Sequence, residues 1–325
     1  MANKIKAGIV GGAGYTGGEA IRLLLNHPEV SLIFVQSRSQ AGKYLYQTHA
    51  DLRGESTMKF TDSISQDIDV LFLCLGHGES SKFLGETPLR DEISVIDLSH
   101  DFRLGESSNQ RSFVYGLPEL NRDKIKTAKN IANPGCFATA IQLGLLPLAK
   151  AGLLKEVFST GITGSTGAGQ KVQETTHFTW RANNISAYKT LAHQHLKEIT
   201  KSVRQLQPDF NGGINFVPWR GDFTRGIFIS SCLSVQKPLN EVLSLFEAFY
   251  ADHPFTVVTE GSIDMKQVVN TNKCLIGLEK VDDKLVIHSS IDNLLKGASG
   301  QAVQNMNLLF GLDETCGLKL KSIAF

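Results

Sequence analysis

The chain has 325 residues, of which 42% are hydrophobic, and a formal net charge of +1, so it is long enough to form two domains with filled cores. A nearly neutral chain gives no reason to expect nucleic acid or an anionic membrane surface as a partner. Its five cysteines are scattered without a Cys-x-x-Cys pair, which argues against a disulfide framework and against structural zinc. We therefore expect a cytoplasmic protein without a bound metal.

The N-terminal part has the pattern of a Rossmann-type domain. Residues 5–10 predict a buried strand, followed by a glycine loop and a helix from about Glu19 to Asn26. The spacing Gly11-x-x-Gly14-x-x-Gly17 lets backbone N–H groups approach a pyrophosphate at the start of that helix. Further buried strands, alternating with helical stretches, are predicted at the ranges 30–35, 69–75 and 94–99. This alternation predicts a parallel sheet that binds a dinucleotide.

The residues after the second predicted strand favour NADP over NAD. An NAD site usually has an acidic residue there for the ribose 2′-hydroxyl, whereas this chain has Ser37, Arg38 and Ser39. A guanidinium and hydroxyls suit a 2′-phosphate, although Arg38 could also be a solvated surface residue. The candidate cofactor-binding residues are Gly11, Gly14, Tyr15, Thr16, Gly17, Ser37, Arg38, Ser39, Gly76, His77 and Asn293.

A cysteine follows an Asn-Pro-Gly turn in the middle of the chain. Pro134 and Gly135 are turn residues, and the apolar stretch at 137–146 predicts a buried helix. Cys136 would then lie in the first turn of that helix, where the helix dipole favours the thiolate over the thiol. The pattern indicates a nucleophile, with a buried cysteine that acts as a small hydrophobe as the alternative.

The remaining half predicts an α+β domain. Strands are predicted at 158–163, 213–218, 225–232, 273–278 and 284–291, and an amphipathic helix at 239–250. The fold class is therefore α/β, with a Rossmann-type parallel sheet and a second domain that has a mostly antiparallel sheet. One face of that second sheet could pack against another subunit. We expect residues 1–135 with 298–325 to bind NADP, and 136–297 to hold the substrate.

Two histidines are candidates for proton transfer. His193 and His195 are predicted to open a helix that continues through Val203, and either could act as a general base or acid near Cys136. A structural role for both is the alternative, and no recognisable ligand spacing supports zinc. The small-residue loop at 164–171 could offer amides and hydroxyls to a phosphate, or could be a plain linker.

Five motifs in this order resemble the N-acetyl-γ-glutamyl-phosphate reductases, which are related to aspartate-semialdehyde dehydrogenase. The motifs are residues 11–17, 97–103, 115–119, 133–136 and 296–305. The resemblance implies Cys136 as the nucleophile and one of His193 and His195, with His193 preferred, as the base. The candidate substrate-binding residues are Asn133, Ser165, Tyr188, Glu198, Arg220 and Arg225.

The resemblance also implies a reaction. It is the NADPH-dependent reduction of an N-acyl-L-glutamyl 5-phosphate to the 5-semialdehyde and phosphate, through a cysteine thioester, in arginine biosynthesis by a homodimer or homotetramer. The chain departs from the family where Gln194 replaces an arginine and where Arg220 lies in an unusual segment. An N-succinyl substrate is therefore an alternative to N-acetyl, with Arg220 as a partner for the extra carboxylate. The rival functions are an aspartate-semialdehyde dehydrogenase-like or aminoadipate-pathway reductase, and a non-catalytic NADP-binding redox sensor.

Overall fold

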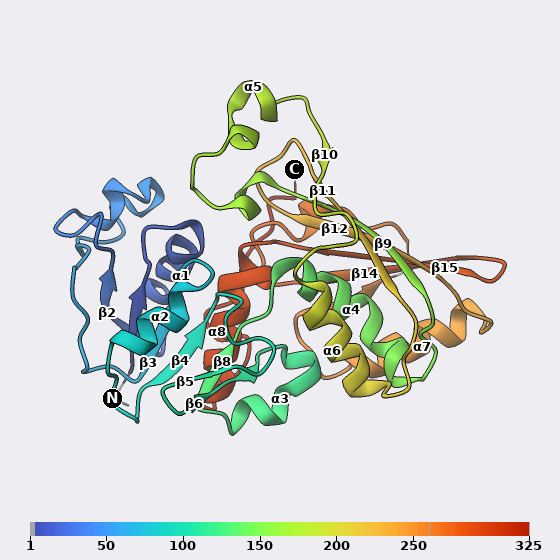
Figure 1. The fold of residues 1–325 in the computed structure, drawn as a ribbon, viewed down its shortest axis with the longest axis horizontal. Coiled ribbons are helices and arrows are strands. Elements are labelled where there is room, and N and C mark those ends of the chain that lie inside the picture. Colours follow the sequence, from blue (N-terminus) through green and yellow to red (C-terminus); the bar gives the residue numbers. More distant parts are fainter. Residues whose placement is uncertain (1–3, 260, 325) are drawn as a thin grey trace. The chain divides into compact units, whose positions relative to one another are not determined.

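The computed structural model describes residues 4–259 and 261–324, which divide into two units (Figure 1). The first unit contains the described residues up to Pro134 together with Ala298–Lys319, and the second contains Gly135–Gly297 with the described residues from Leu320 onward. The sequence pattern predicts that residues 298–325 all belong to the first unit, so the two divisions differ from Leu320 onward. In the structure the Ile323 N–H donates to the Val269 carbonyl (3.3 Å), which is in the second unit.

The first unit contains a parallel six-stranded sheet in the order β2-β1-β3-β4-β8-β7. Its strands are β1 (Ile5–Val10), β2 (Val30–Gln36), β3 (Val70–Leu73), β4 (Ser94–Asp97), β7 (Val114–Tyr115) and β8 (Asn130–Ala132), and β5 (Ser107–Ser108) pairs separately with β6 (Arg111–Ser112). Its helical elements are α1 (Tyr15–Leu25), η1 (Leu45–Gln47), η2 (Ala50–Leu52), α2 (Glu79–Glu86), α3 (Pro118–Lys126) and α8 (Gly300–Leu309). Every residue of β3 and β4 is buried, as expected for strands covered on both faces. The predicted Rossmann-type sheet is confirmed.

Helix α1 begins at Tyr15, four residues before the predicted start. Gly17 and Gly18 suggest a loop by propensity, but both lie in the first turn of the helix because its backbone packs closely. A Cβ on Gly17 would lie 2.7 Å from the carbonyl oxygen of Gly11, and one on Gly18 would lie 2.7 Å from the His49 ring. Tertiary contact therefore overrides the local preference.

The second unit contains a seven-stranded mixed sheet in the order β10-β11-β9-β12-β15-β14-β13. Its strands are β9 (Val157–Thr163), β10 (Ser186–Ala187), β11 (Ile214–Arg220), β12 (Ile227–Ser234), β13 (Thr256–Thr259), β14 (Cys274–Val281) and β15 (Lys284–Ile291). Its helical elements are α4 (Cys136–Lys150), η3 (Ser165–Ala168), η4 (Glu174–Thr176), α5 (Phe178–Arg181), α6 (Leu196–Leu206), α7 (Leu239–Tyr250) and η5 (Met265–Gln267), and a π-helical turn, Leu295–Ser299, crosses the boundary with the first unit. Within the described sheet, four of the six pairs of neighbouring strands are antiparallel, which agrees with the predicted class.

Helices α4, α6 and α7 pack together on one face of this sheet (Figure 1). Strand β12 shows the alternation that results, because Ile227 and Ile229 are buried while Phe228 and Ser230 between and after them are only partly buried. We call the face that carries Phe228, Ser230 and the 57% exposed Phe158 the open face.

Helix α4 contains a proline whose cost is offset by a side chain from α7. Pro147 has no N–H, so the carbonyl of Leu143 one turn earlier has no donor from within the helix. The Tyr250 hydroxyl donates to that carbonyl at 2.5 Å. Within the described residues, no helix is both long enough and apolar enough to span a bilayer.

Candidate active site

Cys136 is the first residue of α4. Its preceding residue, Gly135, has extended backbone (φ −73°, ψ 151°) and offers no side-chain cap to the helix. Cys136 is partly exposed, whereas every residue from Phe137 to Ala149 is buried. The thiol therefore lies at the accessible, positive end of a buried helix, where the N–H groups stabilise a thiolate.

Gly297 has no side chain, and this makes room for Cys136. A Cβ on Gly297 would lie 2.8 Å from the Cβ of Cys136 and 3.2 Å from the carbonyl oxygen of Asp292. The Gly297 N–H donates to that same carbonyl (2.9 Å). The π-helical turn at Leu295–Ser299 thus passes so close to Cys136 that only glycine fits.

His193 and His195 lie before α6 rather than inside it, and His195 is its N-cap residue. The His195 N–H donates to Nδ1 of His193 (3.3 Å), so the neutral His193 ring carries its proton on Nε2. The His193 ring makes edge contacts with Phe137, Tyr188 and Phe216. Burial, helped by the charge of Lys189, lowers the pKa of His193 to about 4, so this imidazole is neutral at pH 7.

Glu198 connects the histidine segment to the start of α4. Its buried carboxylate accepts a hydrogen bond from the Gly135 N–H through Oε2 (3.1 Å). Its other oxygen, Oε1, lies 3.8 Å from Nε2 of His195. One carboxylate therefore positions both the turn before Cys136 and the His195 ring.

Tyr188 connects Cys136 and His193 with Arg220. Burial, together with the charge that Cys136 carries as a thiolate, raises the pKa of Tyr188 to about 12, while Arg220 acts in the opposite direction. The guanidinium carbon of Arg220 lies 4.8 Å from the centre of the Tyr188 ring. The structure thus brings together Cys136, His193, Tyr188 and Arg220, all within the second unit.

Three other candidates in the second unit make structural bonds. Asp292 is fully buried and accepts from Nε of Arg225 (3.1 Å), with Nη2 at 3.0 Å. Asn293, a candidate for the cofactor, accepts from the Gly226 N–H (2.8 Å) and donates to Oγ1 of Thr166 (3.0 Å). Ser165 opens η3, and its N–H donates to the Phe223 carbonyl (2.9 Å).

Asn133 lies in the first unit, where its side chain is held by α8 and by Ala298, two residues before that helix begins. Its Nδ2 donates to the Ala298 carbonyl (3.0 Å), and its Oδ1 accepts from Asn305 (3.1 Å). Its backbone carbonyl accepts from Nε of Arg103 (2.8 Å). These bonds fix Asn133, the first residue of the Asn-Pro-Gly turn, within the first unit.

The glycine loop of the first unit has the backbone shape that a pyrophosphate needs. Gly11 has φ +82°, and Gly14 is the N-cap of α1, where a Cβ would meet only the carbonyl oxygen of Gly11, at 3.9 Å. Because Gly17 and Gly11 are in contact, the first-turn N–H groups of α1 can approach a phosphate directly. These residues fit a dinucleotide.

In the first unit, the candidate cofactor-binding residues outside the glycine loop follow β2 and β3. Ser37 is buried, with its hydroxyl 3.5 Å from that of Ser39, and Arg38 is exposed. His77 is exposed, and its Nδ1 accepts from the His100 N–H (3.3 Å), while the Gly76 N–H donates to Glu79 (3.2 Å). The guanidinium of Arg38 is thus accessible to a phosphate.

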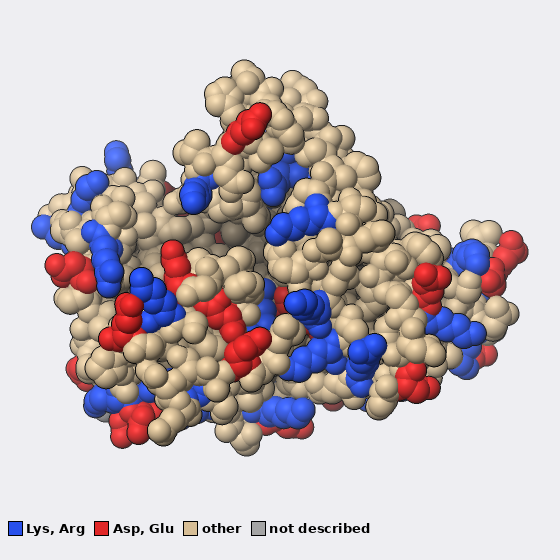
Figure 2. Space-filling view, in the orientation of Figure 1, with Lys and Arg blue, Asp and Glu red and all other residues tan. Residues whose placement is uncertain are grey.

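Charge is mixed on the face of the molecule that Figure 2 shows. On the face shown in Figure 2, basic and acidic side chains are interspersed, in line with the net charge of +1. Among the described residues, no group of three His, Cys, Asp or Glu side chains is arranged to hold a metal ion.

Two residues of the site could not be found from the sequence. Gly297 is one glycine among 30, and its contact with Cys136 depends on the fold of a distant segment. Arg181 lies in a stretch whose sequence predicts neither a strand nor a helix. In the structure it ends α5 and donates to the carbonyl of Arg220 in β11 (2.9 Å), a contact that the sequence does not indicate.

Two family models match the chain. The semialdehyde dehydrogenase NAD binding domain matches residues 6–128, and the semialdehyde dehydrogenase dimerisation domain matches residues 136–293. A curated relative from Christiangramia forsetii, an N-acetyl-gamma-glutamyl-phosphate reductase, is 56% identical over 98% of this chain and 99% of its own. A relative of the same name from Bacteroides fragilis is 55% identical over 99% of this chain and 100% of its own.

Solved structures share the fold at low sequence identity. Aspartate semialdehyde dehydrogenase II from Vibrio cholerae, complexed with ASA, has a TM-score of 0.73 at 16% identity and covers 95% of this chain and 99% of its own. Aspartate semialdehyde dehydrogenase with NADP from Candida albicans has a TM-score of 0.69 at 13% identity and covers 94% of this chain and 98% of its own. These likenesses confirm the two-part α/β fold.

Proposed function

Because the chain belongs to the N-acetyl-γ-glutamyl-phosphate reductases of the semialdehyde dehydrogenase family, we propose that it reduces an N-acyl-L-glutamyl 5-phosphate to the 5-semialdehyde and phosphate. The acyl group is N-acetyl or N-succinyl, and the reaction serves arginine biosynthesis. The observation that carries the proposal is the placement of Cys136 at the head of α4, with His193 and Tyr188 beside it.

The chemistry begins with the thiolate of Cys136. It attacks the 5-carbonyl, and the C–O bond to phosphate breaks, which leaves a thioester on the enzyme. The first-turn N–H groups of α4 stabilise the negative charge on the carbonyl oxygen during the attack. A nicotinamide cofactor, when bound, supplies the hydride that reduces the thioester carbonyl. The C–S bond then breaks, which regenerates the Cys136 thiolate and releases the semialdehyde as the product.

The histidines handle protons in these steps. His193 is neutral at pH 7, so its Nε2–H can donate a hydrogen bond to the carbonyl oxygen, and its Nδ1 can take up a proton in exchange for the hydrogen bond from the His195 N–H. His195 lies beside the Glu198 carboxylate, with its Nε2 3.8 Å from Oε1, so that carboxylate positions the His195 ring. We prefer His193 as the residue that exchanges the proton with the reacting oxygen.

NADP is the proposed cofactor. The loop from Gly11 to Gly17 would hold the pyrophosphate, and Tyr15 and Thr16 contribute their N–H groups at the start of α1. Ser37, Arg38 and Ser39 would bind the 2′-phosphate. The Asn293 side chain is already bonded to Gly226 and Thr166, so a cofactor contact from it would use the one remaining lone pair of its amide oxygen.

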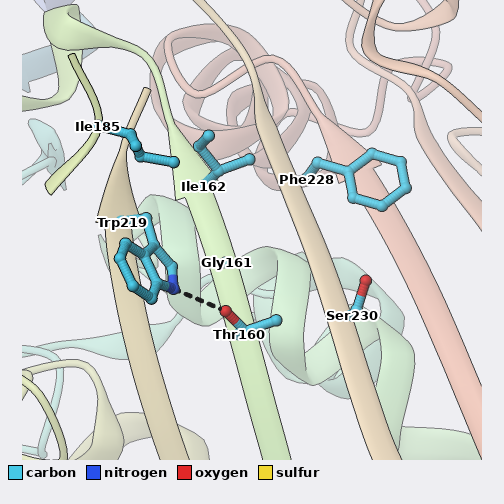
Figure 3. A pocket seen from close by; sticks show the side chains of 7 residues that line it. All are labelled: Thr160, Gly161, Ile162, Ile185, Trp219, Phe228 and Ser230. Atoms are coloured by element: carbon cyan, nitrogen blue, oxygen red, sulfur yellow. Dashed lines mark hydrogen bonds between the residues drawn. The ribbon is translucent and has the colours of Figure 1, made fainter. Parts of the chain in front are cut away.

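The open face of the seven-stranded sheet is the proposed interface of a homodimer. It has a shallow apolar groove of about 250 Å³ lined by residues that include Ile162, Ile185, Trp219 and Phe228 (Figure 3). Trp219 is held there by a hydrogen bond to Oγ1 of Thr160 (2.9 Å). An exposed apolar sheet face of this kind is typical of an association surface, and the matching family model is described as a dimerisation domain. Two such dimers could form a homotetramer.

The reaction run in reverse tests the function. We expect the purified protein to reduce NADP in the presence of phosphate and N-acetyl- or N-succinyl-L-glutamate 5-semialdehyde, and to use NAD poorly. Cys136→Ser should lower kcat by a factor of more than about 10⁴, because the hydroxyl is a far weaker nucleophile. Cys316→Ser is the matched control and should keep wild-type activity, because that cysteine lies in the other unit. Full activity of Cys136→Ser would refute the thioester route.

A further inference from the structure

Arg181 is a buried guanidinium that is only half satisfied. The residue is 9% exposed, and its Nη2 donates to the carbonyls of Asn184 (3.1 Å), Arg220 (2.9 Å) and Gly221. Within the described part of the chain, its Nε and Nη1 are buried and have no hydrogen-bond partner. Unpaired donors of a buried cation are costly, so their presence points to an acceptor that binds there.

Arg220 adds a second cation to the same place. Its Nε is also buried without a partner among the described residues, while Tyr188 takes a hydrogen bond from its guanidinium. Burial and the charge of Arg220 both lower the pKa of Arg181. The charge of Asp222 acts on Arg181 in the opposite direction, and the Asp222 carboxylate accepts from the Asn183 N–H (2.6 Å). One carboxylate against two guanidiniums leaves a net positive charge.

The two arginines lie on the reaction side of the sheet. In β11, Phe216 contacts His193, and the alternation of the strand places Arg220 on the same face and Trp219 on the open face. Arg220 lies over the ring of Tyr188, which contacts His193. Burial and the charge of Cys136 both raise the pKa of Tyr188. The pair is therefore one aromatic ring away from the residues that surround the nucleophile.

We propose that Arg181 and Arg220 form a carboxylate subsite for the far end of the substrate's N-acyl group, so that the substrate carries an N-acyl group derived from a dicarboxylic acid, such as N-succinyl. The inference rests on the proposed function for the rest of the substrate. The reacting phosphate must lie against Cys136, so it is not the anion that sits beyond Tyr188. Two guanidiniums with free N–H groups match the paired oxygens of a carboxylate.

Binding measurements test the subsite without turnover. We would titrate N-succinyl-L-glutamate, its neutral N-succinamoyl analogue and N-acetyl-L-glutamate into the protein by calorimetry. The wild type should bind the succinyl compound at least about tenfold more tightly than either other ligand, as expected for a charge-assisted pair. Arg220→Leu should remove that preference, and Arg220→Lys should restore part of it. Arg181→Lys should weaken only the succinyl compound, while keeping a donor for the loop carbonyls.

Arg53→Leu is the matched control, because Arg53 also lies over a tyrosine ring (Tyr46, 6.0 Å) but in the first unit. It should leave all three affinities unchanged. Equal binding of succinyl and acetyl ligands by the wild type would overturn the subsite. A uniform loss for all three ligands in Arg220→Leu would do the same, because it would assign the arginines to the α-carboxylate that the ligands share. A retained succinyl preference without any turnover would refute the proposed function and leave the subsite standing.

Discussion

Gly297→Ala should damage catalysis far more than stability. The new Cβ would lie 2.8 Å from the Cβ of Cys136, whereas carbon atoms in contact are about 3.5–4.0 Å apart, so the two segments must separate by about 1 Å. A displacement of about 1 Å at a reacting atom costs roughly 100-fold in rate, so kcat/KM should fall by about that factor. Overpacking of this kind costs about 1–3 kcal/mol of folding stability, which leaves a domain of this size folded.

The assay combines kinetics, alkylation and unfolding. The phosphate-dependent reduction of NADP gives kcat/KM, iodoacetamide gives the reactivity of Cys136, and urea gives the free energy of unfolding. Gly85→Ala is the matched control: a Cβ there meets nothing within 4 Å, and alanine in α2 should add up to about 1 kcal/mol of stability with unchanged activity. Wild-type kcat/KM and alkylation in folded Gly297→Ala would show that this contact does not position the nucleophile.

Two further changes test the histidine and the proline. Burial and Lys189 lower the pKa of His193 to about 4, so kcat/KM should fall on the acidic side near pH 4 rather than near pH 6.5. Lys189→Gln removes the positive charge and should move this acidic fall in the kcat/KM profile to higher pH. An acidic fall that stays at the same pH in Lys189→Gln would exclude His193 as the titrating group. Tyr250→Phe should lower the free energy of unfolding by about 1–3 kcal/mol in urea, because the buried Leu143 carbonyl opposite Pro147 loses its donor. A loss below about 0.5 kcal/mol would mean that another donor replaces the hydroxyl.

Elements with a strong local signal were predicted to the residue. Strands β1 and β15 and helix α7 have the predicted bounds, because their apolar periodicity is uninterrupted and turn residues flank them. The sequence predicts that the two histidines open a helix, but α6 begins after them, where the His195 N–H donates to Nδ1 of His193 (3.3 Å). Helix ends are set by such local bonds, which a periodicity does not register.

The site was predicted where motifs are contiguous in sequence and missed where contacts are long-range. The turn before Cys136 is a local pattern, so its position at a helix start could be read from the chain. Gly297 is more than 150 residues from Cys136 in the sequence, and Arg181 is 39 residues from Arg220. Nothing in the sequence shows which of many glycines or arginines the fold will bring to the nucleophile.

The carboxylate of Glu198 separates the residues proposed for catalysis in the second unit from those proposed to bind the acyl group. By bonding the Gly135 N–H and lying beside His195, it joins α4 and α6 into one rigid frame for the nucleophile and the histidines. The arginines belong to other elements, α5 and β11, which are not part of that frame. Substitutions at positions 181 and 220 could therefore retune the choice of acyl group in evolution or in the laboratory, while the thiol and its proton carriers keep their spacing.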